Sequence, residues 1–205
     1  MIFVKTPLIL TKVFFPDMVW HFTRHLTDKN IHLTFDDGPT PDVTHWVLDK
    51  LKEYRATATF FCLGRNVEKY PEIFNRIVEE GHSVGNHTYS HLKGWMVNGH
   101  EYINDVKLAG NFISSDLFRP PYGRIRSGLV NRLKNDFRIM MWDVLSYDFS
   151  QKITPQQCYY NVANNVRSGS IVVFHDSRKA FPNLSYALPG ILDNFSGSHE
   201  FRRIT

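Results

Sequence analysis

The fold is decided by one stretch, Ile31-His32-Leu33-Thr34-Phe35-Asp36-Asp37-Gly38-Pro39. Apolar and polar residues alternate over its first five positions, which is the period of a β-strand, and Gly38-Pro39 ends this pattern as a loop does. Thr40 and Pro41 follow as the N-cap and the first residue of a predicted helix. Later apolar residues recur at helical spacing: Val43, Trp46, Val47, Leu51 and Tyr54. A strand therefore runs through a short loop into a helix.

The same succession of strand and helix repeats along the chain. Seven strands are predicted, near residues 31–35, 58–63, 83–85, 117–119, 139–144, 171–174 and 201–204. Helices are predicted between them, near residues 43–54, 71–80, 101–113, 127–135, 155–167 and 187–194. Strands separated by helices indicate an α/β fold with a parallel sheet. A doubly wound open sheet and a closed barrel of fewer than eight strands both fit. In both, ligands bind at the carboxyl ends of the strands.

Composition excludes several classes of protein. A chain of 205 residues is expected to form one domain, and 21% charged residues without a homopolymeric tract exclude general disorder. There are 24 Lys and Arg against 20 Asp and Glu, with no long basic run, so nucleic acid is not the expected partner. The two cysteines cannot build a disulfide framework, and Cys62 is expected to pack as a small hydrophobic residue. No apolar stretch reaches the 18 residues of a membrane span.

The first thirty residues carry a different pattern. Residues 1–22 are apolar but interrupted by charges and a proline, and the longest uncharged run, residues 6–11, is too short for a signal-peptide core. The expected location is therefore cytoplasmic, with export or membrane association as the alternative. Four apolar residues are expected to pack against the domain, with a membrane surface as the alternative: Phe14, Phe15, Val19 and Trp20.

Acidic and histidine residues follow the first and third predicted strands. Asp36 and Asp37 are adjacent, and two adjacent carboxylates repel each other unless a cation or a proton intervenes, although an acidic Asx-type turn is the alternative. His87 and His91 share one face when the segment turns helically, as metal-binding pairs do, and two surface histidines are the alternative. Two histidines and one carboxylate suit zinc, and also iron, cobalt or nickel.

Later strands add further polar groups. Arg119 and a proline-rich turn follow one strand, a pair of carboxylates including Asp148 follows another, and His175 ends the next. Each alone has an ordinary explanation, such as a surface ion pair or a loop histidine. Five such clusters, each following a strand, meet at one end of a parallel sheet. Together they indicate the site of a metal-dependent hydrolase.

These motifs resemble those of the polysaccharide deacetylases, the NodB-homology group also called carbohydrate esterase family 4. The matching segments are Thr34-Phe35-Asp36-Asp37-Gly38-Pro39, His87-x-x-x-His91, Arg119-Pro120-Pro121-Tyr122 and Phe174-His175. The resemblance covers residues 31–205 and leaves residues 1–30 as an N-terminal extension. It implies a distorted (β/α) barrel of seven strands and so favours the closed layout.

The resemblance also implies a role for each matched residue. Asp37, His87 and His91 would hold one divalent metal, often zinc. Asp36 would be the general base, and Arg119 would orient it.

The remaining roles concern the acid and the substrate. His175 would be the general acid, held by Asp148, and Tyr122 would offer its backbone N–H to the oxyanion. Pro121, Phe149 and Val173 would line the substrate site. The chain departs from the family pattern where Leu145 replaces an acidic or amide residue, Phe149 replaces tryptophan and Val173 replaces leucine.

The expected activity is the hydrolysis of N-acetyl groups on N-acetylglucosamine-type sugars, in chitin oligomers or peptidoglycan-like glycans. The expected partner is thus an N-acetylated oligo- or polysaccharide, and the pattern sets no oligomeric state. Two alternatives are a related amidohydrolase acting on a small cyclic amide and a non-catalytic carbohydrate-binding domain.

Overall fold

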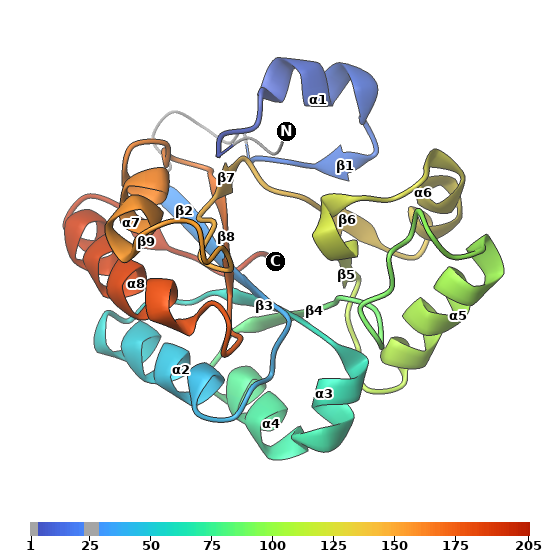
Figure 1. Cartoon of the computed structure of the whole chain (residues 1–205), viewed down its shortest axis with the longest axis horizontal. Coiled ribbons are helices and arrows are strands. Elements are labelled where there is room, and N and C mark those ends of the chain that lie inside the picture. The colour runs from blue at the N-terminus through green and yellow to red at the C-terminus, as the bar shows by residue number, and fades with distance from the viewer. Residues whose placement is uncertain (1–3, 23–28) are drawn as a thin grey trace.

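A curled parallel sheet with helices around its outer side forms the frame of the protein (Figure 1). The computed structural model describes residues 4–22 and 29–205. All strand pairs are parallel, and β9 (Glu200–Phe201) pairs with the start of β2. The other strands lie in the order β1 (Met18–Val19), β6 (Arg138–Met140), β5 (Leu117–Phe118), β4 (Ser83–Asn86), β3 (Thr59–Cys62), β2 (Asn30–Asp36), β8 (Ile171–His175) and β7 (Val144–Leu145).

The helices follow the strands as expected, with differences at their ends. They are α1 (Leu8–Phe14), α2 (Val43–Glu53), α3 (Gly64–Lys69), α4 (Pro71–Glu79), α5 (Gly99–Gly110), α6 (Ser127–Leu133), α7 (Pro155–Ala163) and α8 (Phe181–Ser196). The predicted N-cap at Thr40 is wrong, because its amide donates to Thr44 Oγ1 and the helix begins at Val43. Helix α8 begins six residues earlier than predicted, since Pro182 lies in its first turn, where proline is tolerated.

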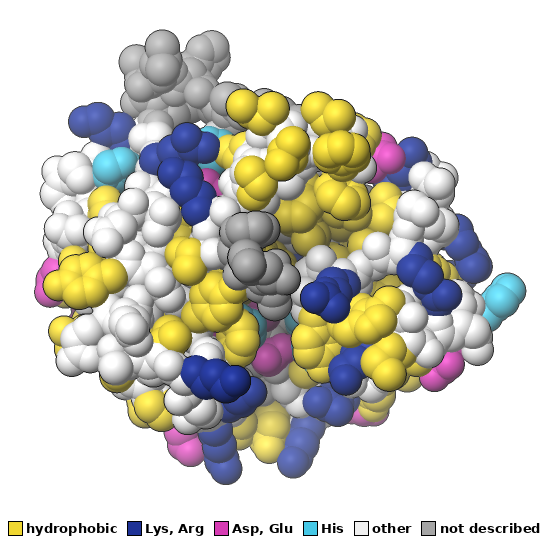
Figure 2. All heavy atoms as spheres, turned by 45° about the horizontal axis from the view of Figure 1, so that its top comes forward, with side chains coloured by type: hydrophobic (Ala, Val, Ile, Leu, Met, Phe, Trp, Pro, Cys, Tyr) yellow, Lys and Arg dark blue, Asp and Glu magenta, His cyan; other side chains and the backbone are white. Residues whose placement is uncertain are grey.

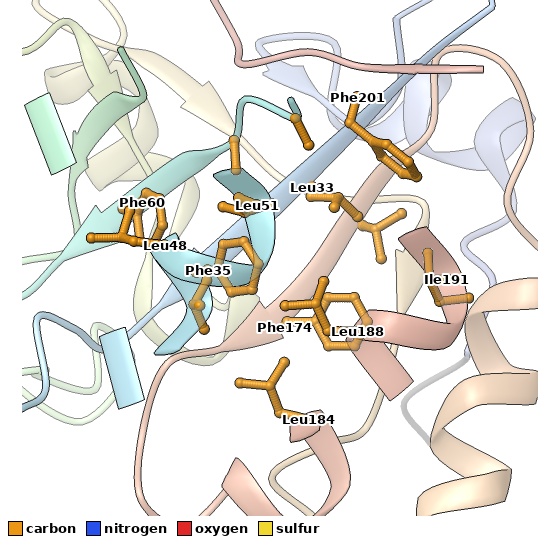
Figure 3. Packing of buried hydrophobic residues seen from close by; sticks show 14 of the residues in the cluster. Leu33, Phe35, Leu48, Leu51, Phe60, Phe174, Leu184, Leu188, Ile191 and Phe201 are labelled. Atoms are coloured by element: carbon orange, nitrogen blue, oxygen red, sulfur yellow. The ribbon is translucent and has the colours of Figure 1, made fainter. Parts of the chain in front are cut away.

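Apolar and polar residues alternate along β2, so that one face of the strand packs in the core and the other faces the inside of the curled sheet. Its apolar residues Leu33 and Phe35 point outward and pack with Phe174 against α2 and α8, as Figure 3 shows. Its polar residues Thr34 and Asp36 alternate with these and are buried on the inner side of the curled sheet. Each strand thus supports the helices with one face and supplies polar groups to the interior with the other.

The predicted strand at residues 139–144 is divided into β6 and β7. Between them, Arg119 donates hydrogen bonds to the carbonyls of Met140 and Met141, so these oxygens are not free to extend the ladder. The gap is filled by the N-terminal segment: Met141 donates to the Val19 carbonyl at 2.7 Å, and Phe22 donates to the Gly169 carbonyl at 2.9 Å. The barrel predicted from the family resemblance is confirmed, and its seam is made by residues 18–22.

The N-terminal extension binds a second strand of the sheet before it reaches the seam. Leu145 donates to the Val4 carbonyl, and Thr6 donates to the Asp143 carbonyl, both at 2.9 Å. The expected packing is wrong for Phe14 and Phe15, which are exposed, because α1 turns Leu8 and Thr11 toward the protein. Val19 and Trp20 are packed against buried clusters. Residues 1–3 and 23–28 of the extension lie outside the described residues.

Two predictions from composition can be compared with the structure. Cys62 and Cys158 are buried and free, and Cys62 packs in the main core as predicted. Within residues 4–22 and 29–205, no helix combines the length and the apolar character needed to traverse a bilayer.

Candidate active site

Three predicted metal ligands meet at the carboxyl ends of β2 and β4. One ligand atom from each of Asp37, His87 and His91 lies within 4.8 Å of the others. Asp37 Oδ1 is 3.2 Å from His91 Nε2 and 3.7 Å from His87 Nε2. This oxygen is buried, and no described residue donates a hydrogen bond to it. A buried carboxylate oxygen without a donor is stable next to a cation, so the donor set fits a divalent metal with nitrogen and oxygen ligands.

The two histidines are oriented by the backbone around them. His87 Nδ1 donates to the Arg119 carbonyl at 2.7 Å, which leaves the Nε2 lone pair directed toward Asp37. The predicted helical turn between His87 and His91 is wrong. Asp105 accepts the amides of Tyr89 and Ser90, so the segment forms a loop in which His91 has a φ of 64°.

Charge in this cluster follows from burial and neighbours. Burial lowers the pKa of His87 to about 4, despite the nearby carboxylates, so this imidazole is neutral as a metal ligand must be. Burial raises the pKa of Asp37, but the imidazoles around it outweigh burial and hold its pKa well below the usual value.

Asp36 and Arg119 form a buried ion pair on one side of this cluster. Arg119 Nη1 donates to Asp36 Oδ1 at 2.7 Å and to Thr34 Oγ1 at 2.7 Å. The guanidinium is completely buried and lies 4.0 Å from the centre of the Phe61 ring. Burial lowers the pKa of Arg119, and Asp36 opposes this shift. The pair holds the Asp36 carboxylate in one orientation beside the metal ligands.

His175 and Asp148 form a second pair, and His175 lies next to Asp36 across the β2–β8 register. His175 Nδ1 lies 2.8 Å from Asp148 Oδ1, and the His175 amide donates to Asp148 Oδ2 at 2.7 Å. Burial lowers the pKa of His175, but the Asp148 carboxylate outweighs burial and raises this pKa to about 9. Asn183 donates to the Asp148 carbonyl and so fixes the loop from α8.

The metal-ligand cluster, Asp36 and His175 all line one cavity of about 380 Å³. It opens on the face seen in Figure 2, where acidic and histidine side chains lie in a hollow with basic and apolar side chains around it. The lining comprises Asp36, Asp37, His87, His91, Tyr122, Trp142, Leu145, Phe149, Val173, His175, Ser177 and Lys179. Arg119 and Asp148 lie behind this lining and act through the residues they hold.

The structure brings together most of the residues predicted for the site. Tyr122, Phe149 and Val173 line the cavity, whereas Pro121 is buried in the 3₁₀ turn η1 (Pro121–Gly123) and is not among the described lining residues. Pro121 is therefore corrected to a residue that shapes the turn. It stands next to Tyr122, whose φ of 61° exposes the aromatic ring.

Asp176 has a structural role that the sequence reasoning missed. Its Oδ1 accepts the Gly38 amide at 3.0 Å, and its Oδ2 accepts the Thr44 hydroxyl at 2.5 Å. A Cβ at Gly38 would lie 2.0 Å from Asp176 Oδ2, so only glycine fits here. Burial raises the pKa of Asp176 to about 7. Its position directly after His175 was the available signal, since a carboxylate at a strand end needs a donor.

Three lining residues were also not predicted. Trp142, Ser177 and Lys179 come from loops after β6 and β8, where the motifs leave side chains unspecified. They give the cavity one apolar wall and one polar rim. The cavity is therefore lined by a carboxylate, a metal-ligand cluster and a charged imidazole. These are the groups that a metal-dependent hydrolase uses.

Comparisons with known proteins agree with this geometry. The family model described as polysaccharide deacetylase matches residues 23–136, more than half of the chain. A peptidoglycan-N-acetylglucosamine deacetylase of Bacillus cereus is 41% identical over 168 residues, which are 76% of this chain and 59% of that protein. The peptidoglycan-N-acetylmuramic acid deacetylase PdaC of Bacillus subtilis is 36% identical over 154 residues, which are 72% of this chain and 32% of that protein. The chain thus spans less than two thirds of these two relatives.

A solved structure extends the agreement to the whole fold. The crystal structure of a peptidoglycan N-acetylglucosamine deacetylase, in complex with 4-naphthalen-1-yl-N-oxidanyl-benzamide, superimposes with a TM-score of 0.83 at 31% identity. The match covers 97% of this chain and 95% of that chain. From the sequence motifs, the barrel and these matches, the chain belongs to the polysaccharide deacetylase family, carbohydrate esterase family 4.

Proposed function

We propose that this protein is a metal-dependent hydrolase that removes N-acetyl groups from N-acetylglucosamine units of a glycan. The observation that carries the proposal is the cavity that the metal-ligand cluster of Asp37, His87 and His91 lines together with Asp36 and His175. Hydrolysis of an amide needs a deprotonated water, polarisation of the carbonyl and a proton for the departing amine. The cavity offers one group for each of these needs.

Asp37, His87 and His91 would hold the metal. Zinc suits one carboxylate and two imidazoles, and cobalt, nickel and iron suit the same donors. A divalent metal in this position supplies a Lewis acid that lowers the pKa of water and polarises a carbonyl. The His87–Arg119 hydrogen bond keeps one ligand in the correct tautomer before any metal arrives.

Asp36 acts as the general base in this proposal. Its carboxylate is held by Arg119 on one oxygen, Oδ1, and faces the cavity beside Asp37. The free oxygen of this carboxylate can accept a proton from the attacking water. The Tyr122 backbone N–H, at the strained turn η1, donates to the developing oxyanion, and one such donor contributes about 3 kcal/mol.

His175 acts as the general acid. The carboxylate of Asp148 raises the pKa of His175 to about 9, so the imidazole carries a proton at neutral pH. It can deliver that proton to the nitrogen of the leaving amine, which is otherwise a poor leaving group. Base and acid thus both line the cavity that holds the metal-ligand cluster.

The acetyl group would occupy the apolar part of the lining. Phe149 packs edge-to-face on His175 with ring centres 5.0 Å apart, and Val173 and Leu145 complete this wall. The relatives suggest the sugar: the Bacillus cereus protein is an N-acetylglucosamine deacetylase and PdaC is an N-acetylmuramic acid deacetylase. The higher identity to the first relative favours N-acetylglucosamine.

Acetate release, measured together with bound metal, tests the proposal. The purified chain is loaded with zinc, cobalt or nickel and given chito-oligomers, peptidoglycan fragments and a cyclic imide. Acetate from the N-acetylated glycans is the expected result. Metal-loaded protein that releases no acetate from any glycan contradicts the proposal, hydrolysis of the imide alone supports the cyclic-amide alternative, and glycan binding without hydrolysis indicates a binding domain.

A further inference from the structure

Helix α1 presents its apolar residues to solvent. Ile9 is 82% exposed and Phe14 is 69% exposed, and both lie in a group that we name the α1 patch: Ile9, Leu10, Val13, Phe14 and Phe15. The side toward the protein holds the buried Thr11. A surface helix of a globular protein normally shows the opposite pattern, with its apolar side inward. An exposed cluster of this kind marks an interaction surface.

The α1 patch is attached firmly to the barrel. Directly before it, Val4 accepts the Leu145 amide and Thr6 donates to the Asp143 carbonyl. At the other end of the patch, the ring of Phe15 lies 6.0 Å from the Trp20 ring, which packs against a buried cluster. The patch is thus held in place at both ends.

Charge around the α1 patch favours one kind of partner. Residues 4–17 contain Lys5, Lys12 and one acidic residue, Asp17, whose charge is balanced by an ion pair with Lys134 at 3.1 Å. The whole chain has a net charge of +4. Figure 2 shows the apolar side chains of α1 gathered in the upper part of the view, with basic side chains beside them. Apolar side chains combined with lysines suit the interface of a bilayer that contains anionic lipids. A second copy of the chain would offer the same lysine-containing segment and thus no complementary charge.

We propose that the α1 patch binds the surface of an anionic lipid bilayer, with its aliphatic and phenyl side chains in the interfacial layer. The cavity lies close to the segment that precedes α1, because Leu145 lines the cavity and its amide donates to the Val4 carbonyl. Bound in this way, the protein would hold its cavity toward glycans close to the bilayer. That last consequence depends on the proposed function, whereas the lipid binding does not.

Vesicle sedimentation of the full chain tests the proposal. The probes are phosphatidylcholine vesicles and vesicles of equal parts phosphatidylcholine and phosphatidylglycerol. We expect binding to the anionic vesicles and at least tenfold lower partitioning of the triple variant Ile9→Ser, Val13→Ser, Phe14→Ser. A matched triple variant at exposed apolar residues outside the patch should bind like the wild type: Val78→Ser, Met96→Ser and Leu108→Ser.

A second variant isolates the charge. Lys5→Gln with Lys12→Gln should weaken binding to the anionic vesicles and leave any weak binding to the neutral vesicles unchanged. An unchanged unfolding temperature of every variant verifies that the barrel is intact.

Three outcomes would overturn the proposal. They are wild-type protein that does not sediment with anionic vesicles, a patch variant that binds as well as the wild type, and a dimer in light scattering that the patch variant converts to a monomer without any lipid binding. Acetate release from soluble oligomers is measured separately. If the protein releases no acetate, the vesicle experiment still tests lipid binding.

Discussion

His87, which is buried, and His175, which is largely buried, line the same cavity, yet their protonation is opposite. The pKa of His87 is lowered to about 4 and that of His175 is raised to about 9. Burial lowers both values, so burial does not explain the difference. The difference lies in the partner of Nδ1, which is the neutral carbonyl of Arg119 for His87 and the carboxylate of Asp148 for His175.

This comparison shows how one residue type serves two purposes. A carbonyl partner fixes the tautomer and leaves a neutral imidazole, which is suited to a metal. A carboxylate partner stabilises the imidazolium, which is suited to proton donation. The groups behind the cavity wall, more than the histidines themselves, separate a ligand from an acid.

Removal of the neutral histidine should have the largest effect. His87→Ala deletes one of three metal-facing atoms, and we expect bound metal to fall below one ion per chain and turnover to fall by about 10⁴-fold. Elemental analysis and acetate release on the same sample measure this. His100→Ala, an exposed histidine on α5, is the control and should match the wild type. Full metal content in the His87 variant would show that this residue is not a ligand.

Asp36→Asn should separate metal binding from chemistry. The amide keeps the shape of the carboxylate but cannot take a proton, so we expect full metal content and a kcat about 10³-fold lower. His91→Ala, in contrast, should lose both metal and turnover. A wild-type rate in the Asp36 variant would remove the general base from this account.

Asp148→Asn should lower the pKa of His175, so that its imidazole is neutral over more of the pH range, as that of His87 is. In the wild type, activity is retained below the raised pKa of His175 and is lost as the pH rises through about 9. Without the Asp148 carboxylate, the largest effect that raises this pKa is lost and only the weaker effects of Asp37 and Asp36 oppose burial. The alkaline limb of the kcat profile should therefore move to lower pH, and kcat at neutral pH should fall about 10²-fold. Asp116→Asn, on the exposed Arg138 pair, is the control. An unmoved alkaline limb would mean that His175 is not the acid.

Among these variants, Phe149→Trp should have the smallest effect on kcat. The larger ring keeps the contact with His175 and adds an N–H donor at the position where the family pattern has tryptophan. We expect kcat within about threefold of the wild type and a change in KM between oligomers of different length. A loss comparable to that of Asp148→Asn would show that Phe149 holds the imidazole in place.

The sequence predicted the barrel and the position of most site residues because both follow from local patterns. The strand Ile31–Phe35 alternates clearly, and the ends of parallel strands meet at one side of the sheet. The division of residues 139–144 was not predictable, because it depends on the side chain of Arg119 reaching across from β5. Strand β1 has two residues and therefore carries no period.

The loop between His87 and His91 illustrates a second limit. Spacing of four residues predicted a shared helical face, and the histidines do converge, but through a loop held by Asp105 from α5. The pattern identified the correct residues for an incorrect geometric reason. The cytoplasmic location and the boundary at residue 30 stay predictions.

The seam made by residues 18–22 bears on how the protein can be shortened. The family match begins at residue 23, so trimming to that boundary would remove the partners of the Met141 amide and the Gly169 carbonyl. Open strand edges of this kind recruit strands from other molecules. A version that begins at residue 23 and keeps the rest of the chain should therefore aggregate, although it retains every residue that lines the cavity.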